Sequence, residues 1–211
     1  LVAYTFAYLV SGRIADLMGT RASMVLFVVW WSLANMLTAA AQGTRSLGAF
    51  RFLLGLGEAG VWPAASKAVS EWFPAKERAL AIGLYTMGAT LGATLAPYLV
   101  IPLATHTWGQ TLPAVSSFFG QGTGWRLAFL LTGGVGLLWL IPWVGLYRAP
   151  RESKLISPAE LQMLDESAAA ESPAGASDKP WTWAQVFTFR GTWLLLVGRL
   201  ITDPVWYFYQ F

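Results

Sequence analysis

The chain lacks cysteine altogether and has little charge. Of its 211 residues only 12% are Asp, Glu, Lys or Arg, and a single histidine is present. Without cysteine, disulfides and thiolate metal sites are excluded. We find no cluster of metal ligands, no nucleophile next to a base and no Gly-rich phosphate loop, so the sequence predicts no catalytic or metal site, no enzyme activity and no cofactor.

Apolar residues dominate what is present. They make up 55% of the chain and the mean hydropathy is +0.50, whereas a soluble domain carries about 25% charged residues. Twelve tryptophans and 21 glycines suit interfacial aromatics and close helix packing in a membrane bundle. The net charge is +3, but the basic residues lie in short turns and form no patch. Their distribution excludes nucleic-acid binding and indicates membrane topology.

Five apolar runs approach the roughly 20 residues that a membrane-spanning helix needs. A shorter run, Leu1–Ser11, is interpreted as the tail of another span. We expect Pro97 and Pro102 to kink the third full run and Pro204 to break the fifth. Both ends of the chain lie in apolar runs, so we interpret it as a fragment. We expect its helices to pack against the missing remainder of the same chain. The five predicted spans are Ala22–Ala41, Leu47–Ser66, Leu80–Leu103, Leu127–Tyr147 and Gly191–Phe211.

Basic residues lie mainly in alternate turns, ten on one side against Arg45 and Arg126 on the other. The positive-inside rule places the first set in the cytoplasm. We predict an all-α integral membrane protein divided into a bundle (1–148), a cytoplasmic loop (149–190) and the start of a second bundle (191–211). The ten basic residues are Arg13, Arg21, Lys67, Lys76, Arg78, Arg148, Arg151, Lys154, Lys179 and Arg190.

Within the polar stretch between Pro150 and Pro180, Ser157 followed by Pro158 and Glu160 predicts a helix that begins with a capping box. The segment Ser167–Lys179 is rich in Ala, Ser, Pro and Gly and is interpreted as a flexible linker. On the opposite side the loop Thr105–Gly124 is long and nearly uncharged, and its His106 has no predicted role.

The first polar motif, Gly12–Arg21, joins two spans. Gly12 would permit close approach of another helix, and Gly19 suits the turn itself. Asp16 can pair with Arg21 or meet the positive end of a neighbouring helix. An ordinary charged turn that anchors topology is the alternative interpretation.

The second motif places Arg51 and Glu58 seven residues apart on one helix face, about 10 Å along the axis. An ionisable group inside a span costs several kcal/mol unless it is paired or hydrated, so it marks a pathway or a proton site. Arg51 suits a carboxylate, and a partly desolvated Glu58 could take up a proton. Two structural groups bonded to neighbouring helices remain the alternative.

The third motif is Thr202–Tyr209, in which Pro204 frees a backbone carbonyl and Asp203 adds an acceptor near it. Arg199 and Asp203 are four residues apart and could instead neutralise each other. The small residues around Thr86 and Thr90 indicate close helix packing, although either hydroxyl could bond to a substrate.

The Gly12–Arg21 turn resembles the signature G-x-L-A-D-R-x-G-R-R of the major facilitator superfamily, with Leu17 and Thr20 where basic residues are common. The resemblance implies that Gly12, Asp16, Gly19 and Arg21 form a conformational gating motif. It also implies a bundle of twelve helices, of which this chain would hold about six.

The stretches 51–60 and 71–79 resemble helix four of the anion:cation symporter branch, which runs R-F-x-L-G-x-G-E-A and then E-W-F-P-x-x-E-R-A. Members carry organic anions with protons. This resemblance implies substrate and proton roles for Arg51 and Glu58, and a substrate contact for Tyr4. The run 202–209 is similar to T-D-P-V-W-W-F-Y of hexuronate transporters, which extends the candidate site to Asp203.

The hypothesis from the sequence is a proton-coupled symporter for a hexuronate or related sugar acid, with the proton as coupling ion. It would work by alternating access in the inner or plasma membrane. Its site would contain Tyr4, Arg51, Glu58, Thr86, Thr90 and Asp203. Another organic anion as substrate, or a sensor that binds the anion without moving it, remain alternatives.

Overall fold

The computed structural model describes residues 2–105, 124–171 and 182–210, and every regular element in these ranges is helical. The chain forms two compact units, Leu1–Ala169 and Ala170–Phe211, and this boundary falls inside the loop predicted over 149–190. The three-part division itself stays a prediction. Most of the loop predicted over Thr105–Gly124, with His106, and the end of the predicted linker, with Lys179, lie outside the described residues.

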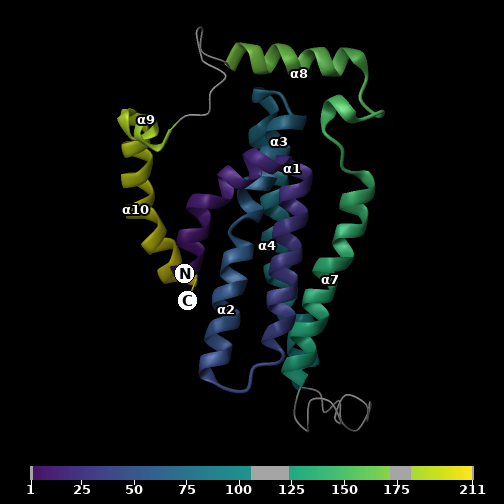
Figure 1. Cartoon of the computed structure of the whole chain (residues 1–211), viewed down its shortest axis with the longest axis vertical. Coiled ribbons are helices and arrows are strands. Elements are labelled where there is room, and N and C mark those ends of the chain that lie inside the picture. The colour runs from purple at the N-terminus through teal and green to yellow at the C-terminus, as the bar shows by residue number, and fades with distance from the viewer. Residues whose placement is uncertain (1, 106–123, 172–181, 211) are drawn as a thin grey trace. The chain divides into compact units, whose positions relative to one another are not determined.

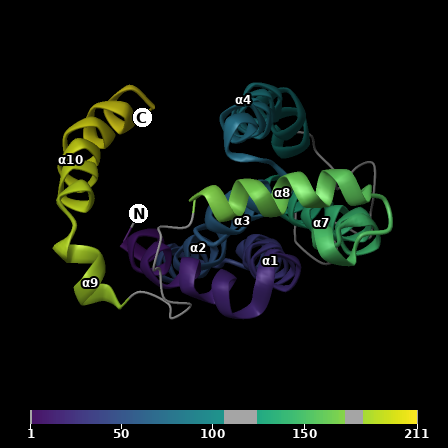
Figure 2. The same ribbon diagram turned by 90° about the horizontal axis from the view of Figure 1, so that it is seen from above.

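In its described residues the first unit holds six α-helices and one 3₁₀ turn (Figure 1). Figure 2 shows α1, α2, α3 and α7 grouped together, with α4 at the edge of the group. The helices are α1 (Val2–Thr38), α2 (Thr44–Glu58), α3 (Val61–Trp72), α4 (Ala75–Thr105) and α7 (Gly124–Leu146), followed by the 3₁₀ turn η1 (Pro150–Glu152) and α8 (Pro158–Glu171). The second unit holds α9 (Trp183–Thr188) and α10 (Arg190–Gln210).

Three of the described helices are long and apolar enough to cross a membrane, namely Ala3–Thr38, Ala75–Thr105 and Gly124–Leu146. Many large apolar side chains on them are exposed, such as Leu84, Tyr98 and Ile141. In a soluble protein such surfaces would be buried, whereas a lipid environment leaves them in apolar surroundings. The helices therefore have the surface of a membrane bundle.

Helix α1 consists of two arms that meet at Gly19, whose φ of 76° and ψ of 161° lie outside the helical region. Positive φ costs glycine little because it has no Cβ, so the prediction that Gly19 makes the turn is confirmed. In Figure 1 the purple start of the chain climbs to this turn and the rest of α1 descends beside α2. We call residues 2–18 the first arm and residues 20–38 the second arm.

The span predicted over Leu47–Ser66 is not one helix, and in this the prediction was wrong. Helix α2 ends at Glu58 and α3 begins at Val61. At the junction, Gly60 N donates to Gly57 O at 3.3 Å instead of continuing the regular ladder. Pro63 has no N–H to offer to the carbonyl of Ala59. A proline close to two glycines therefore interrupts the span directly after Glu58.

The same glycines bring the broken helix close to the second arm of α1. A Cβ on Gly57 would lie 2.7 Å from Trp31 N, and one on Gly60 would overlap the Phe27 ring. Phe27 belongs to a buried apolar cluster that also contains Met24, Val28 and Ala64. Packing against α1 therefore fixes the break in place.

Pro97, Pro102 and Pro204 do not end their helices. Helix α4 continues through Pro97 and Pro102, and α10 continues through Pro204, so the predicted break at Pro204 was wrong. A single proline removes one hydrogen bond, which neighbouring turns tolerate in a membrane helix. The break after Glu58 differs because Gly57 and Gly60 lie within two helical turns before Pro63.

The capping box predicted for α8 is confirmed. Ser157 N donates to Glu160 Oε2 at 2.8 Å, and Glu160 N donates to Ser157 Oγ at 3.2 Å. The helix then runs on to Glu171, so the linker predicted from Ser167 was wrong over its first five residues. The alanines at 168–170 are strong helix formers and extend the helix.

Candidate functional site

Arg51, Gly55 and Glu58 share one face of α2, which we call the charged face. Both charged side chains are exposed, and they lie about 10 Å apart along the axis. Between them, a Cβ on Gly55 would lie 3.4 Å from Ala3 Cβ and 3.6 Å from Tyr4 N. The structure therefore brings the first arm of α1, at Ala3 and the backbone of Tyr4, against the charged face.

The guanidinium of Arg51 lies over the ring of Phe129 on α7, with Cζ 4.9 Å from the ring centroid. Among the described residues, no carboxylate lies within ion-pair distance of Arg51, and Glu58 accepts no hydrogen bond. Two opposite charges on one helix face thus stay apart from each other. Both remain available to bind other groups.

Three predicted site residues, Tyr4, Thr86 and Thr90, make contacts within their own helices. Tyr4 stacks on Tyr8 with centroids 5.6 Å apart. On α4, Thr86 Oγ1 donates to Ile82 O at 2.7 Å and Thr90 Oγ1 donates to Thr86 O at 3.4 Å. Because these donors are used within the helix, each exposed hydroxyl has only acceptor capacity left.

In the second unit, Arg199 and Asp203 form an ion pair of 2.9 Å along α10. The structure therefore contains the mutual neutralisation that the spacing allowed. A substrate role for Asp203 stays a prediction.

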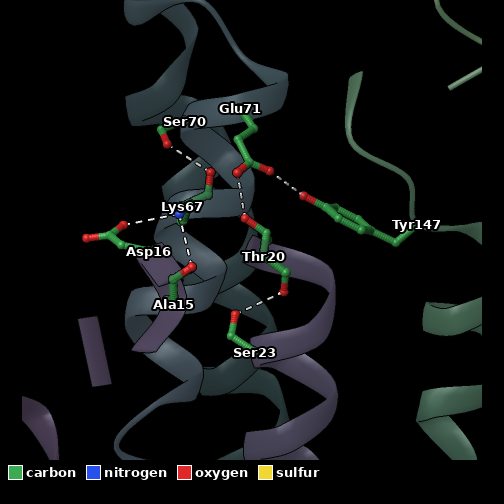
Figure 3. Close-up of polar contacts among 8 residues, drawn as sticks. All are labelled: Ala15, Asp16, Thr20, Ser23, Lys67, Ser70, Glu71 and Tyr147. Atoms are coloured by element: carbon green, nitrogen blue, oxygen red, sulfur yellow. Dashed lines mark hydrogen bonds and ion pairs between the residues drawn. The ribbon is translucent and has the colours of Figure 1, made fainter. Parts of the chain in front are cut away.

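The turn motif lies at one end of the first unit, which we call the basic end. Lys67 of α3 forms an ion pair with Asp16 at 3.1 Å and also donates to Ala15 O at 3.0 Å (Figure 3). Arg21 donates instead to the carbonyl of Val144 on α7. Of the two possibilities that the sequence left open for Asp16, the pairing with Arg21 is not formed, because Lys67 of α3 pairs with Asp16 and Arg21 donates to α7.

Glu71 joins three elements at the basic end. Its Oε1 accepts from Thr20 Oγ1 at 2.7 Å, and its Oε2 accepts from Tyr147 OH at 2.9 Å (Figure 3). Burial and the neighbouring Glu71 carboxylate raise the pKa of the Tyr147 phenol, which therefore stays protonated and donates. We call Thr20, Glu71 and Tyr147 the Glu71 bridge.

Within the described ranges, Gly12 does not make the close helix contact that the sequence predicted for it. No described residue lies within 4 Å of the position that a Cβ on Gly12 would take. The close helix contact predicted for this glycine is therefore not made within the described part of the chain.

Sequence reasoning missed Lys67, Glu71, Tyr147 and Phe129 as site residues. Lys67 and Glu71 are four residues apart, so their shared helix face was a readable signal. Nothing in the sequence marked Phe129 or Tyr147, because each acquires its partner from another helix. As for metals, the described residues contain no group of three or more His, Cys, Asp or Glu side chains that could hold an ion.

Curated relatives that match the chain are transporters. It is 32% identical over 204 residues to a galacturonate transporter of Dickeya chrysanthemi, covering 96% of this chain and 54% of that protein. It is 30% identical to a hexuronate transporter of Escherichia coli K12, covering 97% and 43%. A D-galactonate transporter of Escherichia coli O6:H1 is also 30% identical, covering 97% and 46%. The chain thus spans about half the length of the curated relatives it matches.

Among solved structures, the chain resembles a bacterial homologue of the human lysosomal transporter Spinster in an inward-facing, occupied conformation. The TM-score is 0.58 at 29% identity, over 70% of this chain and 35% of that one. The family model of the Major Facilitator Superfamily matches residues 1–211. With its apolar helices, its signature turn and this match, the chain belongs to the Major Facilitator Superfamily and is a multi-pass membrane protein.

Proposed function

We propose that the chain forms part of a secondary transporter that carries a hexuronate or a related sugar acid by alternating access, together with protons. The relatives named for galacturonate, hexuronate and D-galactonate transport support the substrate class. All three named substrates are sugar acids, which carry a carboxylate and several hydroxyl groups. A site for them needs a cation for the carboxylate and polar groups for the hydroxyls.

One observation carries the proposal, namely that the guanidinium of Arg51, on a helix face beside Tyr4, has no carboxylate partner among the described residues. A guanidinium without a carboxylate partner is costly inside a membrane and marks a functional position. Its planar fork matches a carboxylate bidentately. Arg51 is accordingly the residue that binds the acid group of the substrate.

Glu58 supplies the proton site in this proposal. It stands at the end of α2, immediately before the break, and has no hydrogen-bond partner among the described residues. While it is charged, its carboxylate repels an anion bound about 10 Å away. Protonation removes this repulsion and favours loading, and loss of the proton on the other side favours release.

The Asp16–Lys67 pair fits the gating role that the signature turn implies. Side-chain exposure is 75% for Asp16 and 25% for Lys67, and an exposed pair contributes only about 0–1 kcal/mol. A contact of that strength can open and close during a transport cycle. The neighbouring Glu71 bridge is held by neutral hydroxyl donors and stays closed in the proposal.

The experiment that tests the proposal is uptake of labelled glucuronate and galacturonate by cells that lack hexuronate uptake and express the complete protein. We expect uptake that collapses when a protonophore is added. Absence of uptake of both acids, with the protein shown to be in the membrane, would overturn the sugar-acid proposal. Substrate counterflow in vesicles then distinguishes a transporter of another organic anion from a sensor, which cannot show it.

Proton coupling is tested separately with Glu58→Gln. This variant keeps the size and polarity of the side chain but cannot titrate, so accumulation against a gradient should be lost while counterflow persists. Glu166→Gln on α8 is the matched control, because it makes the same change away from the charged face. Full accumulation by Glu58→Gln would contradict the role of Glu58.

A further inference from the structure

Phe129 lies half-buried on α7, directly beneath the guanidinium of Arg51. Building on the proposed function, we propose that Phe129 is a positioning residue that holds Arg51 ready for the carboxylate of the substrate. The 4.9 Å separation between Arg51 Cζ and the ring centroid is within the range of a cation–π contact. This contact joins two helices that are far apart in the sequence.

Because its partner is an aromatic ring, Arg51 can still bind an anion. A cation–π contact uses the flat face of the guanidinium, whereas its N–H donors all point outward in the plane. A carboxylate partner would occupy those donors and cancel the charge. Phe129 does neither, so Arg51 keeps both its full charge and its fork of donors for an incoming anion.

The backbone that carries Phe129 is itself anchored. Asn35 on the second arm of α1 donates to Phe129 O at 3.1 Å and to Thr132 Oγ1 at 2.9 Å. One turn earlier, Arg126 donates to Ala39 O at 2.6 Å. These three hydrogen bonds hold the start of α7 against the end of α1 and Ala39, which directly follows it.

The ring is supported from the side as well. Trp125 packs edge-on against Phe129 with centroids 6.1 Å apart, and Arg126 lies over Trp125 at 4.7 Å. A fixed ring can define the direction of a flexible arginine side chain, which would otherwise lose conformational entropy when the anion binds. Phe129 should therefore act mainly on substrate affinity.

The experiment replaces Phe129 in the complete protein with phenylalanines that carry one, two and three fluorine atoms. Fluorine withdraws charge from the ring face and weakens a cation–π contact while the ring keeps nearly the same shape. We expect the KM for galacturonate uptake to rise stepwise, to about fivefold in total, at constant Vmax and constant protein in the membrane. A KM that stays flat along the series would overturn the inference.

Conventional variants give a second test. Phe129→Leu should raise the KM, and Phe129→Tyr should restore it because it keeps the ring. Phe52→Leu, which removes an exposed ring from the next position on α2, is the matched control and should leave the KM unchanged. Equal effects of Phe129→Leu and Phe129→Tyr would also overturn the inference.

Wild-type uptake measured alongside separates the two proposals. Normal uptake by the wild type with a flat fluorination series contradicts the role of Phe129 alone. No uptake by the wild type contradicts the proposed function, and the inference falls with it.

Discussion

The charged face of α2 and the basic end both hold ionisable side chains on helices of one bundle, but they differ in how those side chains are paired. At the basic end, Lys67 has two oxygen partners and both oxygens of Glu71 accept hydrogen bonds. On α2, Arg51 meets only an aromatic ring, and Glu58 has no hydrogen-bond partner within 2–105, 124–171 and 182–210.

This difference distinguishes polar groups that hold helices together from polar groups that bind a ligand. Groups whose bonding capacity is satisfied hold helices together, because breaking them leaves a polar atom without a partner. Unsatisfied groups add little to stability and are retained for binding. The comparison therefore assigns fastening to the Glu71 bridge at the basic end and substrate contact to α2, and each assignment can be tested by mutation.

The largest expected effect is on transport by Arg51→Gln. Removing the charge that meets a carboxylate should lower uptake efficiency about 100-fold. The unfolding temperature in detergent should stay nearly unchanged, because Arg51 forms no ion pair with any residue that the structure describes. Arg151→Gln, which breaks an exposed pair with Asp165, is the matched control and should transport normally. A strong loss of stability with intact uptake in Arg51→Gln would reverse the comparison.

Gly57→Ala should give the next largest effect, this time on stability. The added Cβ would lie 2.7 Å from the backbone nitrogen of Trp31, so helices must shift at a cost of about 1–3 kcal/mol. Thermal unfolding in detergent measures this. Gly83→Ala on α4 meets nothing within 4 Å and should be neutral or stabilising. If both substitutions had the same effect, packing of α2 against α1 would not depend on Gly57.

Tyr147→Phe tests the Glu71 bridge. It removes one hydrogen bond to Glu71 but keeps the ring that stacks on Trp143 at 4.1 Å, so we expect a loss of about 1 kcal/mol in unfolding free energy. Tyr85→Phe, which removes only a 3.5 Å contact with Ser66, should cost less. An unchanged unfolding free energy in Tyr147→Phe would show that the bridge does not fasten the helices.

The smallest effect concerns pH and the start of α8. Hydrogen bonds from the backbone and then the side chain of Ser157 lower the pKa of Glu160. A carboxyl whose pKa is lower in the folded state stabilises the fold above its unfolded pKa, and this contribution is lost as the pH falls through the folded pKa. Amide exchange in the first turn of α8 should therefore quicken relative to its intrinsic rate in acid. In Glu160→Gln this pH dependence should disappear, and its persistence would point to another group.

Local features of the site were predictable because they depend on neighbours in the chain. Gly19 is the turn residue because only its backbone accepts positive φ at little cost. The capping box of Ser157 and Glu160 needs just three residues of separation. That Arg51 and Glu58 share a face follows from helical periodicity alone. The break after Glu58 was missed because the apolar run was treated as one span, although Pro63, Gly57 and Gly60 lie close together in it.

The sequence by itself determined the class of protein, the apolar helices and which polar residues fall within them, because hydropathy and helical periodicity are properties of short segments. Only the tertiary structure decided that Asp16 pairs with Lys67, that Glu71 bridges Thr20 and Tyr147, and that Arg51 rests on Phe129. Each of these contacts joins residues that lie far apart in the sequence. Their partners are set by how glycine-lined faces pack, and no local pattern in the chain encodes that geometry.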